Sequence, residues 1–473
     1  MMKRHIKPIL FILTAVVLFL PMAQEHLRLF DFKPLAGVVV KDPQPSVTLA
    51  HFTDNSLQRW IESNLKYNYG LREPFTRFYN QYLWDFYGQS NVVKNKKIYI
   101  SDDGWIYESQ HVDEFYRGRG RFYAKDSIGM AKVFDEEVLR LYRIQKILES
   151  QGTHLFVLLL PGKELVYPEH VPVTDDYPQD KVFSAWEFYG KKFKELGINH
   201  IDVGQWFIEM KDTVDYPLYP QTGTHWSNYA AMHVADSIIR YMEQLGNIKM
   251  EHFTIGEREK RTVAPDDDLE QLMNLVRPLP KIPNYFAETT IIEDSTASHP
   301  SLITIGDSYY WNLLNATPFG KVMGDIRYWY YFNTVYFDNN HNNIKEVDVM
   351  QDVLDADFVM LAYCTPQIYM MSQGFSQQLL LELCCDEEDL VEAKQQLVKD
   401  IRNNQPWMDA LIKNSELYNI PIDSVVNEEA KNSIQKHPTL FVPMLKDSIP
   451  THRSQRYLQY LETKNTQPNG LQQ

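Results

Sequence analysis

The sequence predicts an α/β fold, namely a doubly wound and mostly parallel sheet with helical additions at the N- and C-terminal ends. One observation is that short apolar runs alternate with segments of helical periodicity through the middle of the chain. Another is that the runs 155–160 and 302–305 are apolar without alternation, as in strands buried on both faces. A third is size, because 473 residues with 44% apolar content suffice for one large domain with appendages.

The N-terminal segment 1–25 has the layout of a secretory signal or a signal-anchor. Lys3, Arg4 and Lys7 precede the apolar run 9–20. The run is shorter than the roughly 20 residues of a full span, but the segment after it is a poor cleavage site. Because positive charge stays on the cytoplasmic side, we expect an uncleaved anchor with the rest of the chain outside the cytoplasm. A cleaved signal and a buried helix are the alternatives.

The next segments are a tether, a helix and a hairpin. Residues 26–54 are rich in Pro, Val and Lys, and 56–87 have dense apolar spacing typical of a helix. Two short alternating runs, 97–100 and 105–107, flank an Asp-Gly pair and predict a β-hairpin.

Helices and strands then alternate, which predicts the parallel sheet. Periodic apolar positions indicate the helices, and short apolar runs indicate the strands. In chain order the expected elements are helix 135–151, strand 155–160, helix 183–196, strand 198–203, a helix capped by Ser227, strand 302–305 and strand 358–362.

The remaining segments set the predicted domain limits. Residues 246–300 show little periodicity and are interpreted as an excursion at the edge of the sheet. Residues 386–463 are amphipathic and helical, and 464–473 form a polar tail that we expect to be disordered. The main domain is therefore placed at 55–385.

Charge and cysteine content exclude two kinds of site. The chain has 47 basic and 62 acidic residues and a net charge of −15, whereas a nucleic-acid surface needs basic residues to neutralise phosphates. The three cysteines form no CxxC pair, so neither a zinc site nor a disulfide framework is expected. We expect no metal, no cofactor and no nucleic-acid partner.

A candidate nucleophile follows the strand 302–305 in the tripeptide Gly306-Asp307-Ser308. A serine at a strand-to-helix turn is held at the carboxyl edge of the sheet, where open α/β folds place their sites. Backbone N–H groups of such a turn can stabilise an oxyanion. An ordinary turn that caps the following helix is the alternative.

A candidate base lies in Thr224-His225-Trp226, just before the helix capped by Ser227. Histidine is the usual base for a serine nucleophile because it titrates near neutral pH. Taken alone, His225 fits a hydrogen-bonded structural histidine. Together with the Ser308 turn it predicts a nucleophile–base pair, whose order along the chain is no obstacle.

Four features, in their order and approximate spacing, resemble a known family over about residues 55–375. They are Asn-Tyr-Gly-Leu-Arg at 68–72, Asp-Gly-Trp-Ile-Tyr at 103–107, Leu-Leu-Leu-Pro-Gly-Lys-Glu-Leu-Val-Tyr-Pro-Glu at 158–169, and the pair Thr-His-Trp at 224–226 with Gly-Asp-Ser-Tyr at 306–309. The chain resembles the SGNH-hydrolase-like proteins of alginate and related exopolysaccharide O-acetylation.

The resemblance implies an SGNH-type sheet and a periplasmic, serine-dependent O-acetyltransferase. Ser308 matches the nucleophile that accepts the acetyl group, and His225 matches the base. The acceptor would be a hydroxyl of a cell-surface polysaccharide. The resemblance also implies a multi-pass membrane acyltransferase as the donor partner, with this chain held at the inner membrane by its N-terminal segment.

One position departs from the family pattern, because Gly223 stands where the family has an aspartate two residues before the histidine. In a serine triad the aspartate fixes the histidine tautomer, and its replacement can cost about 10⁴ in rate. Three interpretations stay open: another carboxylate substitutes, first Asp202 and second Asp215; the site is a Ser–His dyad; or the chain is a non-catalytic glycan-binding or assembly protein. An acetylesterase on the same site is a further alternative.

Residues around the pair are expected to support it. These are Asp307, Thr224 and Trp226, together with Asn312, which lies one turn after Ser308 and is a candidate oxyanion donor. Solvation on a helix surface is the alternative for Asn312.

Aromatic residues near the turn are candidates for sugar stacking, namely Tyr309, Tyr310 and Trp329. Aromatic clusters more often fill cores, so core packing is the alternative.

Overall fold

The computed structural model describes residues 2–37, 44–119, 127–177, 183–337, 340–446 and 450–466. The chain divides into two compact units, each of which is described by itself. Unit 1 comprises Met1–Ser109, Gln221–Thr224 and Asp267–Ile282, and unit 2 comprises Gln110–Pro220, His225–Asp266 and Pro283–Gln473.

Unit 1 begins with helix α1 (Met2–Leu27). Among the described residues, no helix is both long enough and apolar enough to cross a membrane, and the signal-anchor stays a prediction. Within the predicted tether 26–54, helix α2 (Leu49–Thr53) forms, and residues 38–43 lie outside the described residues.

The helix predicted at 56–87 is two helices, α3 (Ser56–Tyr67) and α4 (Arg72–Tyr87). The turn between them contains Gly70, a residue with low helix propensity. The predicted hairpin is confirmed, because β1 (Ile98–Ile100) and β2 (Ile106–Glu108) pair antiparallel.

Unit 2 contains the seven-stranded sheet, with strand order β12-β11-β10-β9-β13-β3-β4. The strands β10, β9, β13, β3 and β4 are parallel, and β11 and β12 add antiparallel at one edge. Their bounds are β3 His154–Leu160, β4 His200–Asp202, β9 Leu302–Gly306, β10 Ile326–Tyr330, β11 Thr334–Phe337, β12 Asn340–Asn343 and β13 Phe358–Cys364. The predicted mostly parallel sheet is confirmed.

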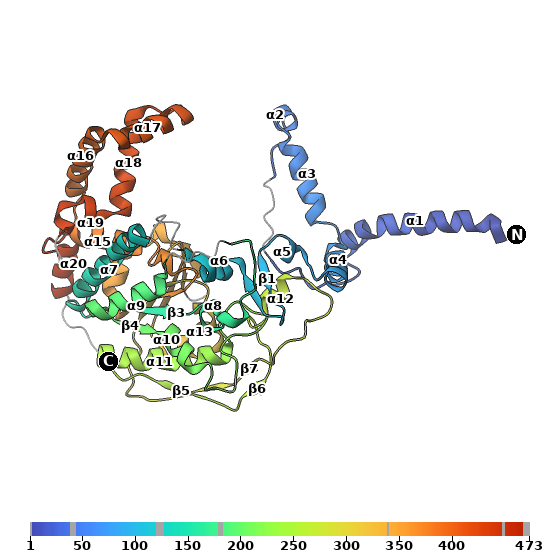
Figure 1. Ribbon diagram of the computed structural model, residues 1–473, viewed down its shortest axis with the longest axis horizontal. Coiled ribbons are helices and arrows are strands. Elements are labelled where there is room, and N and C mark those ends of the chain that lie inside the picture. The colour runs from blue at the N-terminus through green and yellow to red at the C-terminus, as the bar shows by residue number, and fades with distance from the viewer. Residues whose placement is uncertain are drawn as a thin grey trace. The chain divides into compact units, whose positions relative to one another are not determined.

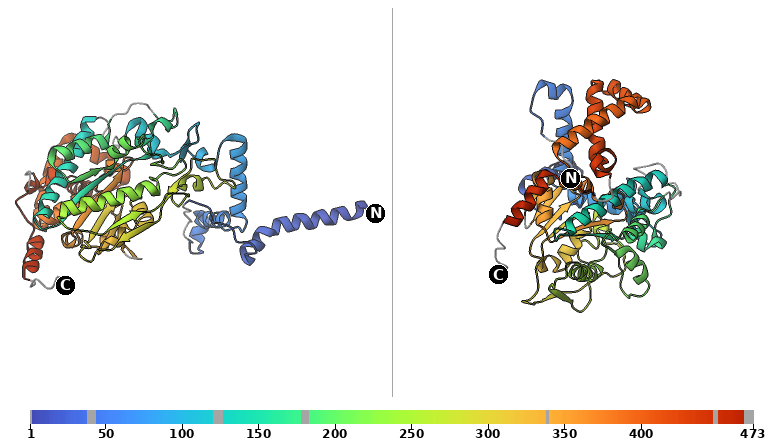
Figure 2. Two further views of the ribbon diagram at one scale, coloured as in Figure 1. Left: turned by 90° about the horizontal axis from the view of Figure 1, so that it is seen from below. Right: turned by 90° about the vertical axis from the view of Figure 1, so that its left-hand side faces the viewer.

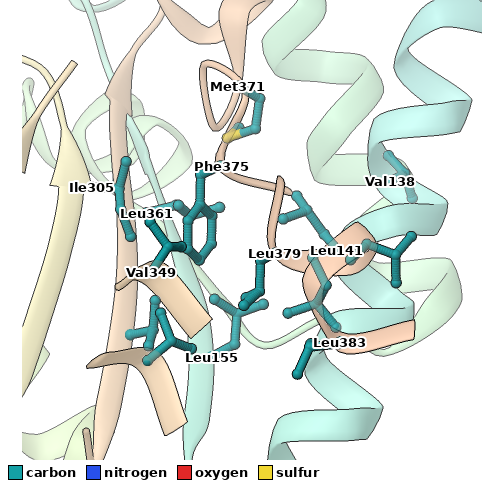
Figure 3. Close-up of a cluster of buried hydrophobic side chains, with 14 of the residues drawn as sticks. Val138, Leu141, Leu155, Ile305, Val349, Leu361, Met371, Phe375, Leu379 and Leu383 are labelled. Carbon is teal, nitrogen blue, oxygen red and sulfur yellow. The ribbon is translucent and has the colours of Figure 1, made fainter. Parts of the chain in front are cut away.

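Helices cover both faces of this sheet (Figure 1, Figure 2). On one face, Leu155 and Leu159 of β3 join a core with α7 (Ser127–Glu149), α9 (Ala185–Leu196) and α15 (Phe375–Cys384). Figure 3 shows this core between the strands and the helices.

On the opposite face, the ring of Phe156 lies 5.6 Å from that of Tyr241 on α11 (Asn228–Gly246). Successive side chains of β3 thus point to opposite faces and are buried on both. This arrangement explains the apolar run without alternation.

Residues 246–300 and the shorter helices remain to be described. Within residues 246–300, which we interpret from the sequence as an excursion at the edge of the sheet, four short strands form two antiparallel pairs, β5 with β8 and β6 with β7. These strands are largely half-buried or exposed, so no apolar run marks them. Other bounds are α5 Asn91–Lys94, α6 Ser109–Arg117, α8 Lys163–Val166, α10 Val203–Met210, β5 His252–Ile255, β6 Glu259–Lys260, α12 Asp268–Leu272, β7 Tyr285–Phe286, β8 Thr289–Ile292, α13 Tyr310–Ala316 and α14 Val349–Asp355.

The C-terminal region is helical, as predicted. Its helices are α16 Glu387–Asn403, α17 Gln405–Tyr418, α18 Ile422–Lys436, α19 Pro438–Phe441 and α20 Gln455–Thr466. Helix α20 extends into the segment predicted to be a disordered tail, and residues 467–473 lie outside the described residues. The predicted domain limits stay a prediction.

Candidate active site

Ser308 stands in the turn that connects the central strand β9 to helix α13. Gly306, the last residue of β9, lets the strand pack closely against its neighbour because it has no side chain. A Cβ at Gly306 would lie 2.4 Å from the carbonyl oxygen of Ala362 on the neighbouring strand β13. Ser308 itself is half-buried, at the carboxyl edge of the sheet, which is the edge where doubly wound folds place ligands.

His225 reaches the same point from the loop that precedes α11. Its Nε2 atom lies 2.8 Å from Ser308 Oγ, which is hydrogen-bond distance and within reach for proton transfer. His225 is also half-buried. The structure therefore brings together the two residues predicted to form the pair, and their roles stay a proposal.

Asn312 holds the histidine loop and does not reach toward an oxyanion. Its Nδ2 atom donates to the carbonyl oxygen of Trp226 at 3.3 Å and to Oδ1 of Asn228 at 3.2 Å. Asn312 is 1% exposed, so solvation on a helix surface is wrong as well. The candidate oxyanion donor is thus corrected to a residue that ties α13 to the start of α11.

Asn228 and Asp266 were not among the candidate residues, yet they fix the same loop. The Asn228 N–H donates to Asp266 Oδ1 at 3.2 Å, and its amide donates to the carbonyl oxygens of Val263 and Ala264. The side chain of Ser227 caps α11, as predicted, by accepting from the N–H of Ala230. The only sequence signal was the helix cap.

Thr224 and Trp226, the residues on either side of His225, both have partners within their own units. Trp226 is fully buried, and its ring lies 5.8 Å from that of Tyr309. In unit 1, the N–H of Thr224 donates to Asp268 Oδ1 at 2.8 Å. The supporting roles that we expect for these residues stay a proposal.

Asp307 supports the turn as an acceptor. Its carboxylate accepts from the N–H of Cys364 at 2.7 Å and from the N–H of Tyr309 at 3.1 Å. Burial raises the pKa of this carboxyl, and these hydrogen bonds and the charge of His225 act in the opposite direction. A carboxylate that accepts in this way stabilises the turn and supplies no proton to an oxyanion.

The backbone of Ser308 offers a donor for an oxyanion. Within the part of the chain that the structure describes, the Ser308 N–H donates no hydrogen bond. The neighbouring N–H of Tyr309 is occupied by Asp307. In the serine-protease oxyanion hole, the backbone N–H of the nucleophilic serine is itself a donor.

Neither carboxylate chosen from the sequence contacts His225. Asp202 caps α10 and accepts from the N–H of Gln205 and the indole of Trp186. It lies at the end of β4, three positions from β9 in the sheet. Asp215 is largely exposed and pairs with Arg258. The predicted catalytic role of Asp202, and of Asp215 as second choice, is therefore corrected.

A buried polar cluster adjoins the site, and the sequence did not indicate it. Glu164 accepts from Thr365 Oγ1 and contacts His111 Nδ1, and all three residues are buried. Burial raises the pKa of Tyr309 well above its ordinary value, and the Glu164 carboxylate adds to the rise. The Tyr309 ring also lies 5.0 Å from the His225 ring, so a neutral aromatic side chain packs beside the imidazole.

The three aromatic residues predicted to stack sugar rings lie in the core. Tyr309, Tyr310 and Trp329 are each at most 2% exposed. Burial closes their faces to a ligand, so the alternative of core packing holds and the substrate-binding prediction is corrected.

Other aromatic rings near the turn are half-buried. We call Trp311, Tyr330, Tyr331 and Tyr336 the aromatic shelf. The Trp311 ring lies 5.0 Å from that of Tyr336 and 6.4 Å from that of Tyr330, and the Tyr330 and Tyr331 rings are 4.5 Å apart. The Trp311 N–H donates to the Ser308 carbonyl oxygen at 3.2 Å, so the shelf begins beside the nucleophile turn.

One group of metal-ligating side chains lies outside this site. Among the described residues, Asp386, Asp389 and His452 bring ligand atoms within 4.8 Å of one another. The two aspartates already serve the start of α16, where the Asp389 carboxylate accepts from the Asp386 N–H. Helix capping accounts for their positions.

Comparison with known proteins gives a family match over part of the chain. Residues 98–310 match the model described as "SGNH hydrolase-like domain, acetyltransferase AlgX". No curated protein sequence matches the chain.

Three solved structures are similar to the chain at low identity. The O-acetyltransferase domain of Pseudomonas putida AlgJ is 14% identical, covers 58% of this chain and 92% of its own, and has a TM-score of 0.38. Pseudomonas aeruginosa AlgX is 13% identical with coverages of 59% and 66% and a TM-score of 0.36. Bacillus cereus PatB1 with a sulfonyl adduct is 13% identical with coverages of 58% and 96% and a TM-score of 0.35.

Proposed function

We propose that the chain is a serine-dependent O-acetyltransferase, because residues 98–310 match the model of an SGNH hydrolase-like acetyltransferase domain. Ser308 is the nucleophile and His225 is its base. The observation that carries this proposal is the 2.8 Å distance between His225 Nε2 and Ser308 Oγ. A purely glycan-binding protein has no need of this hydrogen-bonded pair at an accessible sheet edge.

The reaction proceeds in two balanced steps. Ser308 Oγ attacks the carbonyl carbon of an acetyl ester or thioester while His225 takes the hydroxyl proton and then passes it to the leaving group. An acceptor hydroxyl next attacks the acetyl-serine, its proton passes to His225 and returns to Ser308, and the acetylated acceptor leaves. The free N–H of Ser308 supports the oxyanion in both steps.

The missing motif aspartate makes the Ser–His pair the catalytic unit of this proposal. With Gly223 at that position, the loop contacts of Asn312 and Asn228 help to orient His225. The negative charge of Asp307, which interacts electrostatically with His225, favours the protonated imidazole during the reaction.

The acceptor in this proposal is a hydroxyl of a cell-surface polysaccharide. Support comes from the half-buried aromatic shelf, because flat ring faces suit the apolar faces of sugars. The periplasm is the proposed location, with the N-terminal segment holding the chain at the inner membrane and a multi-pass membrane acyltransferase supplying the acetyl group.

Substitution of the nucleophile tests the proposal. Ser308→Ala should abolish transfer of acetyl to an oligosaccharide acceptor and leave the fold intact, whereas Ser298→Ala, at an exposed serine of the same unit, should leave transfer unchanged. Assays with and without the oligosaccharide separate transfer from hydrolysis, which would indicate an acetylesterase. Unchanged transfer by the Ser308→Ala protein would overturn the proposal.

A further inference from the structure

A cavity of about 930 Å³ lies in unit 2, away from Ser308. It is lined by residues of α7, α15 and α18 and by the segment that follows β13. Its volume falls within the roughly 300–1,000 Å³ of small-molecule sites. The lining combines aromatic rings with side-chain amides, including Phe134, Tyr189, Phe332, Tyr369, Gln373 and Gln377.

Two carboxylates of this cavity interact with neighbouring protein side chains. Glu137 accepts from Ser372 at 2.6 Å, from Ser376 at 3.1 Å and from Arg140 Nη2 at 2.5 Å. The Glu136 carboxylate lies 2.9 Å from His437 Nδ1. Glu137 therefore accepts three hydrogen bonds from protein side chains, and Glu136 is engaged by His437.

Two hydrogen-bond donors remain without acceptors. Within the described ranges of the chain, Arg140 Nη1 donates no hydrogen bond and lies 3.6 Å from Glu136, and Gln373 Nε2 donates none either. The Arg140 side chain is 4% exposed. Because an unpaired buried donor is costly, both atoms are available to a ligand that supplies acceptor oxygens.

The loop that presents Gln373 has an unusual backbone. Ser372, Gln373 and Gly374 have φ angles of 62°, 49° and 100°, and a left-handed backbone is unfavourable for residues other than glycine. The Ser372 hydroxyl holds the loop by bonding Glu137 and accepting from the Ser376 N–H. The loop thus positions the Gln373 amide at the expense of backbone strain.

We propose that this cavity binds a neutral oligosaccharide segment. Among the described residues that line it, the two buried polar atoms without a partner are donors. Its walls include half-buried Phe332 and Tyr369, and sugar hydroxyl and ring oxygens supply acceptors. Glu136, Glu137 and Glu382 outnumber Arg140 and Lys436 in the lining, so an anionic chain is disfavoured. The choice of a glycan rests on the proposed function.

The cavity and the acetylation site share one turn. Tyr331 of the aromatic shelf and Phe332 of the cavity wall are consecutive residues after β10, with φ angles of 50° and 48°. The Tyr331 N–H donates to the carbonyl oxygen of Gly306, two residues before Ser308. A glycan held in the cavity is therefore a second anchor for the acceptor chain.

Direct binding measurements test this inference. Calorimetry with a neutral β-1,4-glucan hexasaccharide should show binding to the full chain, and Gln373→Asn should weaken it about tenfold, because the shorter amide retreats while asparagine tolerates the left-handed backbone. Gln351→Asn, the same change at an exposed position of α14, should bind as the wild type does. A hexuronate of equal length should bind more weakly than the glucan.

The outcomes distinguish this site from the proposed function. Absence of glucan binding, equal binding by Gln373→Asn and wild type, or preference for the hexuronate would overturn the cavity proposal. Hydrolysis of a small acetyl ester should be unchanged in Gln373→Asn, since the residue is outside the Ser308 site. Glucan binding that is retained in an inactive Ser308→Ala protein supports the cavity whatever the fate of the acetyltransferase proposal.

Discussion

The Nε2 atom of His225 lies 2.8 Å from Oγ of Ser308, although the two residues are 83 positions apart in the chain. The parallel sheet produces this contact. Strand β9 delivers Ser308 to its carboxyl edge, and the loop before α11 delivers His225 to the same edge. The pair is then held by side chains that take no part in the chemistry.

Replacement of the base should remove most activity. His225→Gln should lower kcat/KM for an activated acetyl ester by about 10²- to 10⁴-fold, because no general base then accepts the Ser308 proton. Steady-state kinetics measure the loss. His233→Gln, at a half-buried histidine on α11, is the matched control, and equal rates for the two variants would contradict the assigned base.

The loop contact of Asn312 should matter for stability and for turnover. Asn312→Ala leaves the Trp226 carbonyl oxygen and Asn228 Oδ1 without this donor, which should cost about 1–3 kcal/mol of unfolding free energy. It should also lower kcat more than it changes KM, because His225 loses its orientation. Asn315→Ala, on the exposed side of the same helix, should change neither quantity, and a silent Asn312→Ala would show that the loop is held otherwise.

The aromatic shelf should affect the large acceptor only. Tyr336→Ala should raise KM for a polysaccharide acceptor about threefold to tenfold, since one stacking face is lost. Hydrolysis of a small ester should be unaffected, because Tyr336 does not touch the Ser–His pair. Tyr418→Ala, at an exposed tyrosine of α17, controls for a surface change, and the shelf assignment fails if both variants show the same KM.

Asp307 should make stability depend on pH. Burial raises the pKa of its carboxyl above 3.8 in the folded chain. The folded state then binds this proton more tightly than the unfolded state, so the stabilising contribution is full below pH 3.8 and declines as the pH rises through the raised pKa.

Relative to Asp307→Asn, the wild type should therefore lose unfolding free energy as the pH rises from about 4, and the difference should then level off. Urea denaturation of both proteins at a series of pH values measures the trend. A constant difference, or one that grows in favour of the wild type, is incompatible with a raised pKa.

The sheet and the Ser–His pair were predictable because both depend on local signals. Apolar runs such as 155–160 identify buried strands, and the carboxyl ends of parallel strands meet at one edge, so Ser308 was placed correctly. Chain order along a parallel sheet contains enough information to bring two loops together.

The supporting residues were not predictable, because their roles depend on long-range contacts. From the sequence, Asn312 could equally lie on a helix surface exposed to solvent. In the structure its side chain donates to residues at the start of α11. Asp202 stands correctly at a strand end, but β4 is the edge strand of the sheet. A sequence read strand by strand does not give the strand order that separates Asp202 from His225.

The short strands of 246–300 were missed for a related reason. Their residues are mostly half-buried or exposed, so hydrophobic alternation is weak. The aromatic residues were mispredicted in the opposite sense, because Tyr309, in the turn after β9, and Trp329, within β10, pack inward.

We expect the transferred acetyl group to pass through Ser308. Peptide mapping by mass spectrometry of the full chain, rapidly quenched during turnover of an activated acetyl ester, measures this directly. One acetyl group should be found on the peptide that contains Ser308, and none on that peptide from the Ser308→Ala protein. Acetyl transfer at the wild-type rate with no acetyl on Ser308 would contradict it.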